Sequence, residues 1–108
     1  MSSQKYVDVE RELQNLENEV SQKNYRVIRE FIDHAAAEGI SETQQTRKIQ
    51  SLKCLLRNFA PEDFQLRGAS ETELKQLMAG LNRSEYAAST KHKIKGTVKK
   101  FYRIENGG

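Results

Sequence analysis

Residues 89–103 read STKHKIKGTVKKFYR, and this stretch predicts an amphipathic helix. Ile94, Val98 and Phe101 recur at helical spacing, so one side of the helix would face a core. The remainder carries six Lys and Arg residues, His92 and no acid. Without those six cations, the chain's eighteen basic residues fall to twelve against fifteen acidic residues, and the net charge changes from +3 to −3. The stretch therefore predicts a helix that packs inward on one side and presents cations to a polyanion on the other.

A helical wheel separates the cationic side of this helix from its core side. The outward face holds His92, Lys95, Gly96, Lys99 and Arg103, with Lys93 and Lys100 beside it. Lys91 lies nearer the core edge and would extend its aliphatic stem along apolar surface. Cations without neighbouring acids bind phosphates and release counterions, which makes binding sensitive to salt. The alternative is a solvated helix face with one tolerated glycine.

Helix signals recur in three further segments, at residues 24–38, 41–60 and 70–81. Ser41 with Gln44, and Ser70 with Glu73, have the spacing of capping boxes. Gly39 stands where a helix would end in a left-handed residue. The expected core positions of the last two segments are Ile49, Leu52, Leu56 and Phe59, with Leu55 at the edge, and Leu74, Leu77, Met78 and Leu81. Short connections and the lack of strand patterns predict an all-α single domain, a bundle of four helices.

The N-terminal residues leave two alternatives. Val9, Leu13, Leu16 and Val20 form one narrow helical stripe, so residues 1–20 are an extension that is either a further helix or disordered. We expect the helical domain to span residues 21–105 and a linker to begin at residues 106–108, where two glycines end the sequence.

Composition restricts the class of protein. No apolar run approaches the roughly 20 residues that a membrane helix needs, and residues 1–12 lack the apolar segment of a secretory signal. Cys54 is the only cysteine, so a disulfide framework is excluded. These features predict a cytoplasmic protein without a membrane partner.

Catalytic patterns are missing from the sequence. It has no glycine-rich phosphate loop, no paired carboxylates and no zinc-ligand spacing. His34 and His92 stand alone, and no His–acid pair is placed to activate Cys54. We therefore expect no catalytic residue, metal or cofactor in this chain.

A second polar surface lies at the start of the 41–60 segment. Its side away from the core shows Thr43, Arg47 and either Gln50 or Ser51, then Cys54 and Asn58, and it is flanked by Gln44 and Lys48. Thr, Gln and Arg side chains can read base edges in a major groove. Spacing alone favours the other interpretation, an ordinary polar helix surface.

Two parts of the chain, residues 24–59 and 68–104, resemble the N-terminal SAM-like, or core-binding, domain of phage-integrase-type tyrosine recombinases, the archaeal branch in particular. The resemblance depends most on GISE at residues 39–42, STKH at 89–92 and KKFYR at 99–103. It implies a four-helix SAM-like bundle that forms one half of a clamp around duplex DNA, with its second and fourth helices against the DNA.

The resemblance also implies which residues bind DNA and which partners take part. The expected contacts are Thr43, Gln44, Arg47, Lys48 and Ser51 on one helix and Thr90, Lys91, His92, Lys95 and Lys99 on the other, to which the wheel adds Arg103. The family's Arg/Lys/His/Arg pocket and nucleophilic Tyr belong to a C-terminal catalytic domain, and this chain lacks them. We expect an N-terminal domain that binds DNA without cutting it, whose parent protein would take part in DNA integration and recombination with a catalytic domain and other recombinase protomers.

One alternative remains open. A non-enzymatic helical module could use the basic last helix to dock an acidic protein partner. A membrane-surface role for that helix is disfavoured because Ile94, Val98 and Phe101 are needed to close the core.

Overall fold

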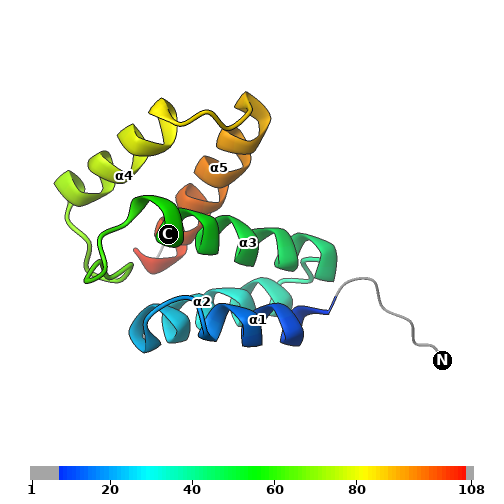
Figure 1. The fold of residues 1–108 in the computed structure, drawn as a ribbon. Coiled ribbons are helices and arrows are strands. Elements are labelled where there is room, and N and C mark those ends of the chain that lie inside the picture. The colour runs from blue at the N-terminus through cyan, green and yellow to red at the C-terminus, as the bar shows by residue number, and fades with distance from the viewer. Residues whose placement is uncertain (1–7, 107–108) are drawn as a thin grey trace.

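The computed structural model describes residues 8–106, and this part of the chain folds into five α-helices without a strand. In chain order they are α1 (Val9–Glu17), α2 (Gln22–Ala37), α3 (Glu42–Phe59), α4 (Glu71–Arg83) and α5 (Ala88–Glu105). α3 contacts each of the other four helices. Figure 1 shows α1 and α2 together on one side of α3, with α4 and α5 on the other side. The predicted all-α bundle with an additional N-terminal helix is confirmed.

α1 settles the two alternatives for the part of the N-terminal extension that the structure describes. The helix begins after Asp8, whose carboxylate accepts a hydrogen bond from the Arg11 backbone N–H at 3.2 Å. Leu13 and Leu16 are only 1% and 0% exposed and belong to the same apolar cluster as the other helices. α1 is therefore part of the core. Residues 1–7 lie outside the described part of the chain.

Serine side chains cap the next three helices. Ser21, Ser41 and Ser70 each accept a hydrogen bond from the backbone N–H three residues on, at 3.1–3.2 Å. Ser70 and Glu73 form the complete capping box that their spacing predicts, with the Ser70 N–H donating to Glu73 at 2.8 Å. At Ser41 the structure has only the serine half of the box, because the reciprocal bond to the Gln44 side chain is not formed.

Gly39 ends α2 as its position predicts. Its φ of +88° lies in the left-handed region, and the Ile40 N–H donates to the Ala35 carbonyl at 3.0 Å. This hydrogen bond satisfies a carbonyl that the end of the helix would leave unpaired.

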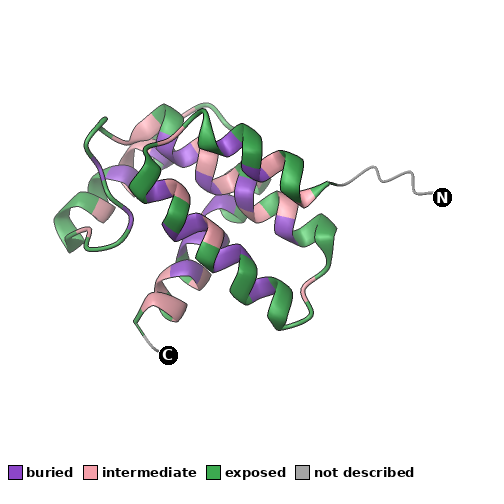
Figure 2. Cartoon of the chain, turned by 90° about the horizontal axis from the view of Figure 1, so that it is seen from below, coloured by how far each residue is buried: buried purple, intermediate pink, exposed green. Residues whose placement is uncertain are grey.

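Phe101 of α5 is the centre of the core. Its side chain is 0% exposed, and its ring packs edge-on against Phe31 of α2, with 5.3 Å between the ring centroids. Val98 and Ile94, one and two turns before it, are buried on the same side of α5. The predicted core side of the last helix is confirmed, and Figure 2 shows buried residues along the inward faces of the helices.

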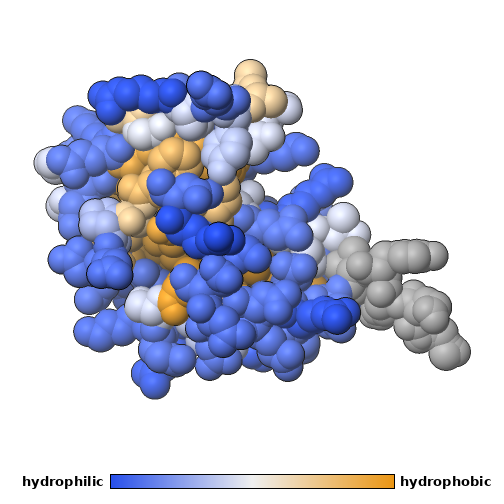
Figure 3. Space-filling view, in the orientation of Figure 1, coloured by the Kyte–Doolittle hydropathy of each residue, from blue (hydrophilic) through white to orange (hydrophobic). Residues whose placement is uncertain are grey.

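The contact between α3 and α4 differs from the prediction. Leu55, expected at an edge, is 1% exposed, whereas Phe59, Leu74 and Met78, expected in the core, are only half-buried. α4 approaches α3 at Gly80, where an added Cβ would lie 3.3 Å from Cδ1 of Phe59. The two helices contact each other there without closing over the apolar side chains on either side. Figure 3 shows the apolar hollow that remains between them.

A buried asparagine anchors the connection between α3 and α4. The Asn24 side-chain amide donates to the Phe64 carbonyl at 2.8 Å, and its oxygen accepts from the Leu66 N–H at 2.9 Å. The Tyr102 hydroxyl donates to the Leu66 carbonyl at 2.6 Å, and burial is the main cause that raises the pKa of this hydroxyl. Phe64 and Leu66 are buried, as expected for residues that fix this connection. Hydrogen bonds thereby join the connection to α2 through Asn24 and to α5 through Tyr102.

Candidate nucleic-acid interface

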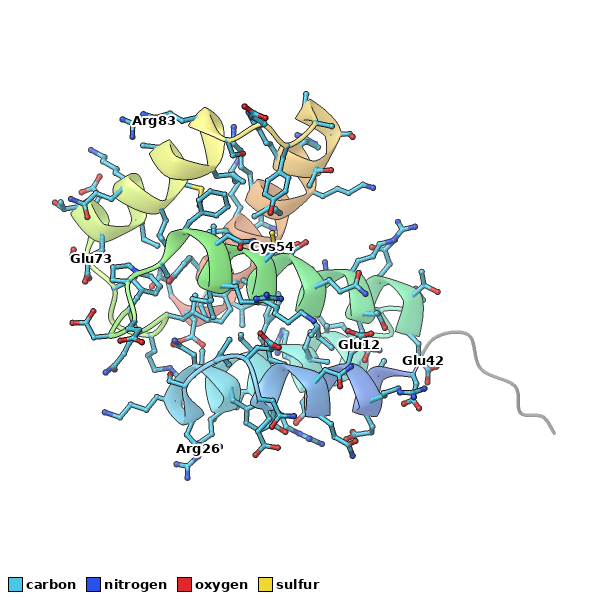
Figure 4. All side chains as sticks on the ribbon, viewed as in Figure 1. Glu12, Arg26, Glu42, Cys54, Glu73 and Arg83 are labelled. Atoms are coloured by element: carbon cyan, nitrogen blue, oxygen red, sulfur yellow. The ribbon has the colours of Figure 1, made fainter. Side chains whose placement is uncertain are left out.

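α3 and α5 enclose an open groove of about 490 Å³ between their polar sides. α3 contributes Gln44, Arg47, Lys48, Gln50, Ser51 and Cys54 to its lining, and α5 contributes Thr90, His92, Lys93, Ile94, Gly96 and Thr97. None of these lining residues is an Asp or Glu. Figure 4 labels Cys54 on the side of α3 that faces α5. The groove is therefore a concave, acid-free surface that two separate segments of sequence build together.

The core side of α3 determines which of its residues reach the groove. Ile49 and Leu52 are fully buried, and the residues one helical flank away from them face α5. Gln44, Lys48 and Ser51 follow one another at intervals of four and three residues, so they share that flank. The opposite flank faces α1, where Arg57 pairs with Glu19 at 3.2 Å.

Thr97 and Lys93, one turn apart on α5, are linked by a hydrogen bond within the helix. Thr97 is buried, and its hydroxyl donates to the Lys93 carbonyl at 3.1 Å. This bond satisfies a polar group that burial would otherwise leave unpaired. Lys93 itself is exposed at the groove.

Unpaired cations give the groove its charge. Among the described residues, Arg47, Lys48 and Lys93 form no ion pair with a carboxylate. Burial lowers the pKa of Lys48, and the neighbouring charge of Lys100 lowers it further. Lys100 has one acidic neighbour, Glu38 of α2, at 3.7 Å. An anion in the groove would relieve the repulsion between these cations.

Six of the eleven residues predicted to bind DNA line the groove: Gln44, Arg47, Lys48, Ser51, Thr90 and His92. The other five are outside it: Thr43, Lys91, Lys95, Lys99 and Arg103. Thr43, Lys99 and Arg103 are exposed. The structure thus brings four of the five predicted α3 residues together with Thr90 and His92 near the start of α5, while it places the predicted α5 lysines elsewhere.

The basic side of α5 divides into two stripes. The Lys91 ammonium group donates to the Asn82 carbonyl at the end of α4, at 2.9 Å. Lys95 follows one turn later on the same flank and is half-buried. Lys93 and Gly96 lie on the other flank and line the groove. The wheel separates these flanks but does not show which of them faces α3, because that depends on how the helices pack.

The groove residues that were not predicted to bind DNA include Lys93, which the wheel placed only beside the outward face. Its signal in the sequence is its spacing. Lys93 lies three residues after Thr90, three before Gly96 and four before Thr97, so these residues share a flank of the helix. That stripe becomes meaningful only once α3 is known to lie against it.

A tyrosine in the α4–α5 connection closes one end of this region. The Tyr86 hydroxyl oxygen accepts hydrogen bonds from the Asn58 amide at 3.0 Å and from the Cys54 thiol at 3.3 Å. Its ring packs edge-on against Phe59, with 6.1 Å between centroids. The hydrogen bond with Cys54 is the main cause that raises the pKa of Tyr86. This cluster ties the α4–α5 connection to the C-terminal part of α3.

Other kinds of site were sought over residues 8–106. They contain no group of three or more His, Cys, Asp or Glu side chains arranged to hold a metal ion. None of their helices is both long and apolar enough to cross a bilayer.

Comparisons with protein-family models, with curated proteins and with solved structures find no match to this chain. The resemblance to the recombinase family therefore stays a prediction from the sequence, and the functional argument depends on the groove.

Proposed function

We propose that this chain binds double-stranded DNA through the groove between α3 and α5. The observation that carries the proposal is the absence of any acid among the groove's lining residues, while three of its cations have no carboxylate partner in the described structure. Phosphates are the anions that such a surface fits, because each neutralised phosphate releases counterions. Gln44 and Arg47 add side chains that can also read base edges.

Within that class, we propose the core-binding domain of a site-specific tyrosine recombinase. The sequence resemblance supports it, and so does the all-α bundle in which α3 and α5, the helices that the resemblance assigns to DNA, lie side by side. The chain would hold DNA for a catalytic domain that belongs to the parent protein and would cut no DNA itself.

The first test is charge reversal on the two helices of the groove. Lys48→Glu with Lys93→Glu removes two phosphate contacts, so affinity for a labelled duplex should fall by about 100-fold or more at low ionic strength, measured by fluorescence anisotropy. Lys23→Glu with Arg26→Glu is the matched control, because both residues are exposed on α2 and form no ion pair within the described chain. Equal losses in the two double variants would contradict a specific role for the groove.

An acidic protein partner is the alternative reading of the same charge. DNA and an acidic polypeptide differ in charge density, and duplex DNA carries one negative charge per roughly 1.7 Å of its axis. We therefore expect polyglutamate to displace DNA only at a large molar excess of charge. Displacement at equal charge, together with weak binding of duplex DNA alone, would favour the protein-docking function.

A further inference from the structure

Neither the backbone conformation nor a close contact within the fold requires a glycine at position 96, in the middle of α5. Gly39 and Gly68 have φ of +88°, which L side chains rarely adopt, and Gly80 faces Phe59 at 3.3 Å from a built Cβ. Gly96 has neither constraint: its φ is not positive, and a Cβ there would meet nothing within 4 Å. Glycine destabilises a helix interior relative to alanine, so the fold would be better served by a side chain at this position.

Basic side chains surround Gly96 on the surface of the helix. His92 and Lys93 precede it by four and three residues, and Lys99 and Lys100 follow it by three and four. Residues at these spacings are neighbours on a helix surface, with about 5–6 Å between Cβ atoms. Gly96 is thus a gap in a ring of four basic residues, and it lies in the lining of the groove.

The surroundings of this gap are almost free of negative charge. Arg47 and Ser51 of α3 line the other side of the groove. Among residues 8–106, Glu38 is the one acid that pairs with a member of the ring, through Lys100 at 3.7 Å. The centre of the ring is open space rather than a protein contact.

We infer that a backbone phosphate of the bound DNA contacts α5 at Gly96, and we call this position the phosphate seat. The missing side chain lets the phosphodiester strand approach the surface of α5 between Lys93 and Lys99. The inference depends on the proposed function and adds to it the point of closest approach. In this arrangement one sugar–phosphate backbone follows the groove, whose volume is about 490 Å³, and the remaining duplex lies outside it.

Gly96→Ala tests the seat because its two effects have opposite signs. The methyl group favours the helix and should raise the Tm by about 4 °C. The same methyl group moves the strand away from the ring, so affinity for duplex DNA should fall by about three- to tenfold. The loss should be similar for unrelated DNA sequences, because a phosphate contact carries no sequence information. Gly96→Gln, with a larger side chain, should lose more affinity than Gly96→Ala.

Asn15→Ala is the control for helix stabilisation alone. Asn15 is exposed on α1, on the other side of α3 from the groove, and alanine should raise the Tm there without changing DNA binding. If wild-type chain binds DNA and both Gly96 variants bind equally well, the phosphate seat is wrong and the proposed function stands. If the wild-type chain binds no duplex at low ionic strength, the proposed function is wrong and the seat falls with it.

Discussion

The two sides of α3 differ in whether their basic side chains are paired with acidic ones. On the side of α1 and α2, basic side chains meet acids: Arg29 pairs with Glu10 at 3.1 Å and Arg57 with Glu19 at 3.2 Å. In the α3–α5 groove, Lys48 has a lysine for its charged neighbour. A cation that is already paired with a carboxylate in the fold contributes little to binding an anionic ligand, whereas an unpaired cation can bind one. The difference teaches that the position of cations relative to acids, rather than the net charge of +3, marks the candidate interface.

Phe101 is buried in the core that both sides of α3 share. Its removal should therefore have the largest effect on stability. Phe101→Ala deletes a fully buried ring that contacts Phe31 and Tyr102 and should lower the free energy of unfolding by about 3–5 kcal/mol. Urea denaturation followed by circular dichroism measures the change. DNA binding should fall in parallel with the folded fraction. A stable variant with unchanged midpoint would show that the packing described around Phe101 is wrong.

Asn24 of α2 anchors the connection between α3 and α4 and lies outside the lining of the groove. Asn24→Ala leaves the Phe64 carbonyl and the Leu66 N–H without their partner, which should cost about 2–3 kcal/mol of stability. Binding measured well below the midpoint of unfolding should stay near wild type. Asn24→Asp serves as a second variant, since it keeps the acceptor for Leu66 but loses the donor to Phe64. Stability equal to wild type in both variants would contradict the anchoring role.

Sequence reasoning succeeded where short-range spacing decides the structure. Ile94, Val98 and Phe101 identified the core side of α5, and Ser70 with Glu73 identified the start of α4. It failed where partners come from distant segments. Asn24 looks like an ordinary helix residue until the backbone about 40 residues later is placed on it.

The candidate site divides in the same way. Residues 41–51 and 89–103 could each be recognised as polar or basic, because composition and periodicity are local. Their meeting in one groove, with Lys93 toward α3 and Lys91 toward α4, follows from how α5 packs between α3 and α4. The pattern within α5 separates the two flanks but does not show which neighbour each one faces.

Glu105 of α5 provides a smaller test, because it forms an ion pair with Arg67 of the α3–α4 connection. Hydrogen bonds from Arg67, at 2.9 and 3.0 Å, hold the pKa of Glu105 below its ordinary value of 4.5. A carboxyl whose pKa is lowered by folding adds stability above its ordinary pKa and loses it as the pH falls through the folded value. Wild type should therefore lose more Tm than Glu105→Gln when the pH is lowered below 4.5, by a small amount because Arg67 is half exposed. Identical pH profiles for the two proteins would show that the pair adds no stability.

The salt dependence of DNA binding tests the role of the groove most directly. If Arg47, Lys48 and Lys93 each neutralise one phosphate, log Kd should rise with log salt with a slope of about 3, from 0.9 per contact. Lys48→Ala with Lys93→Ala should lower that slope by about 2, whereas Lys91→Ala with Lys95→Ala, on the flank of α5 that lies outside the groove, should lower it by less. A slope unchanged by the first pair and reduced by the second would place the phosphates outside the groove and contradict this account.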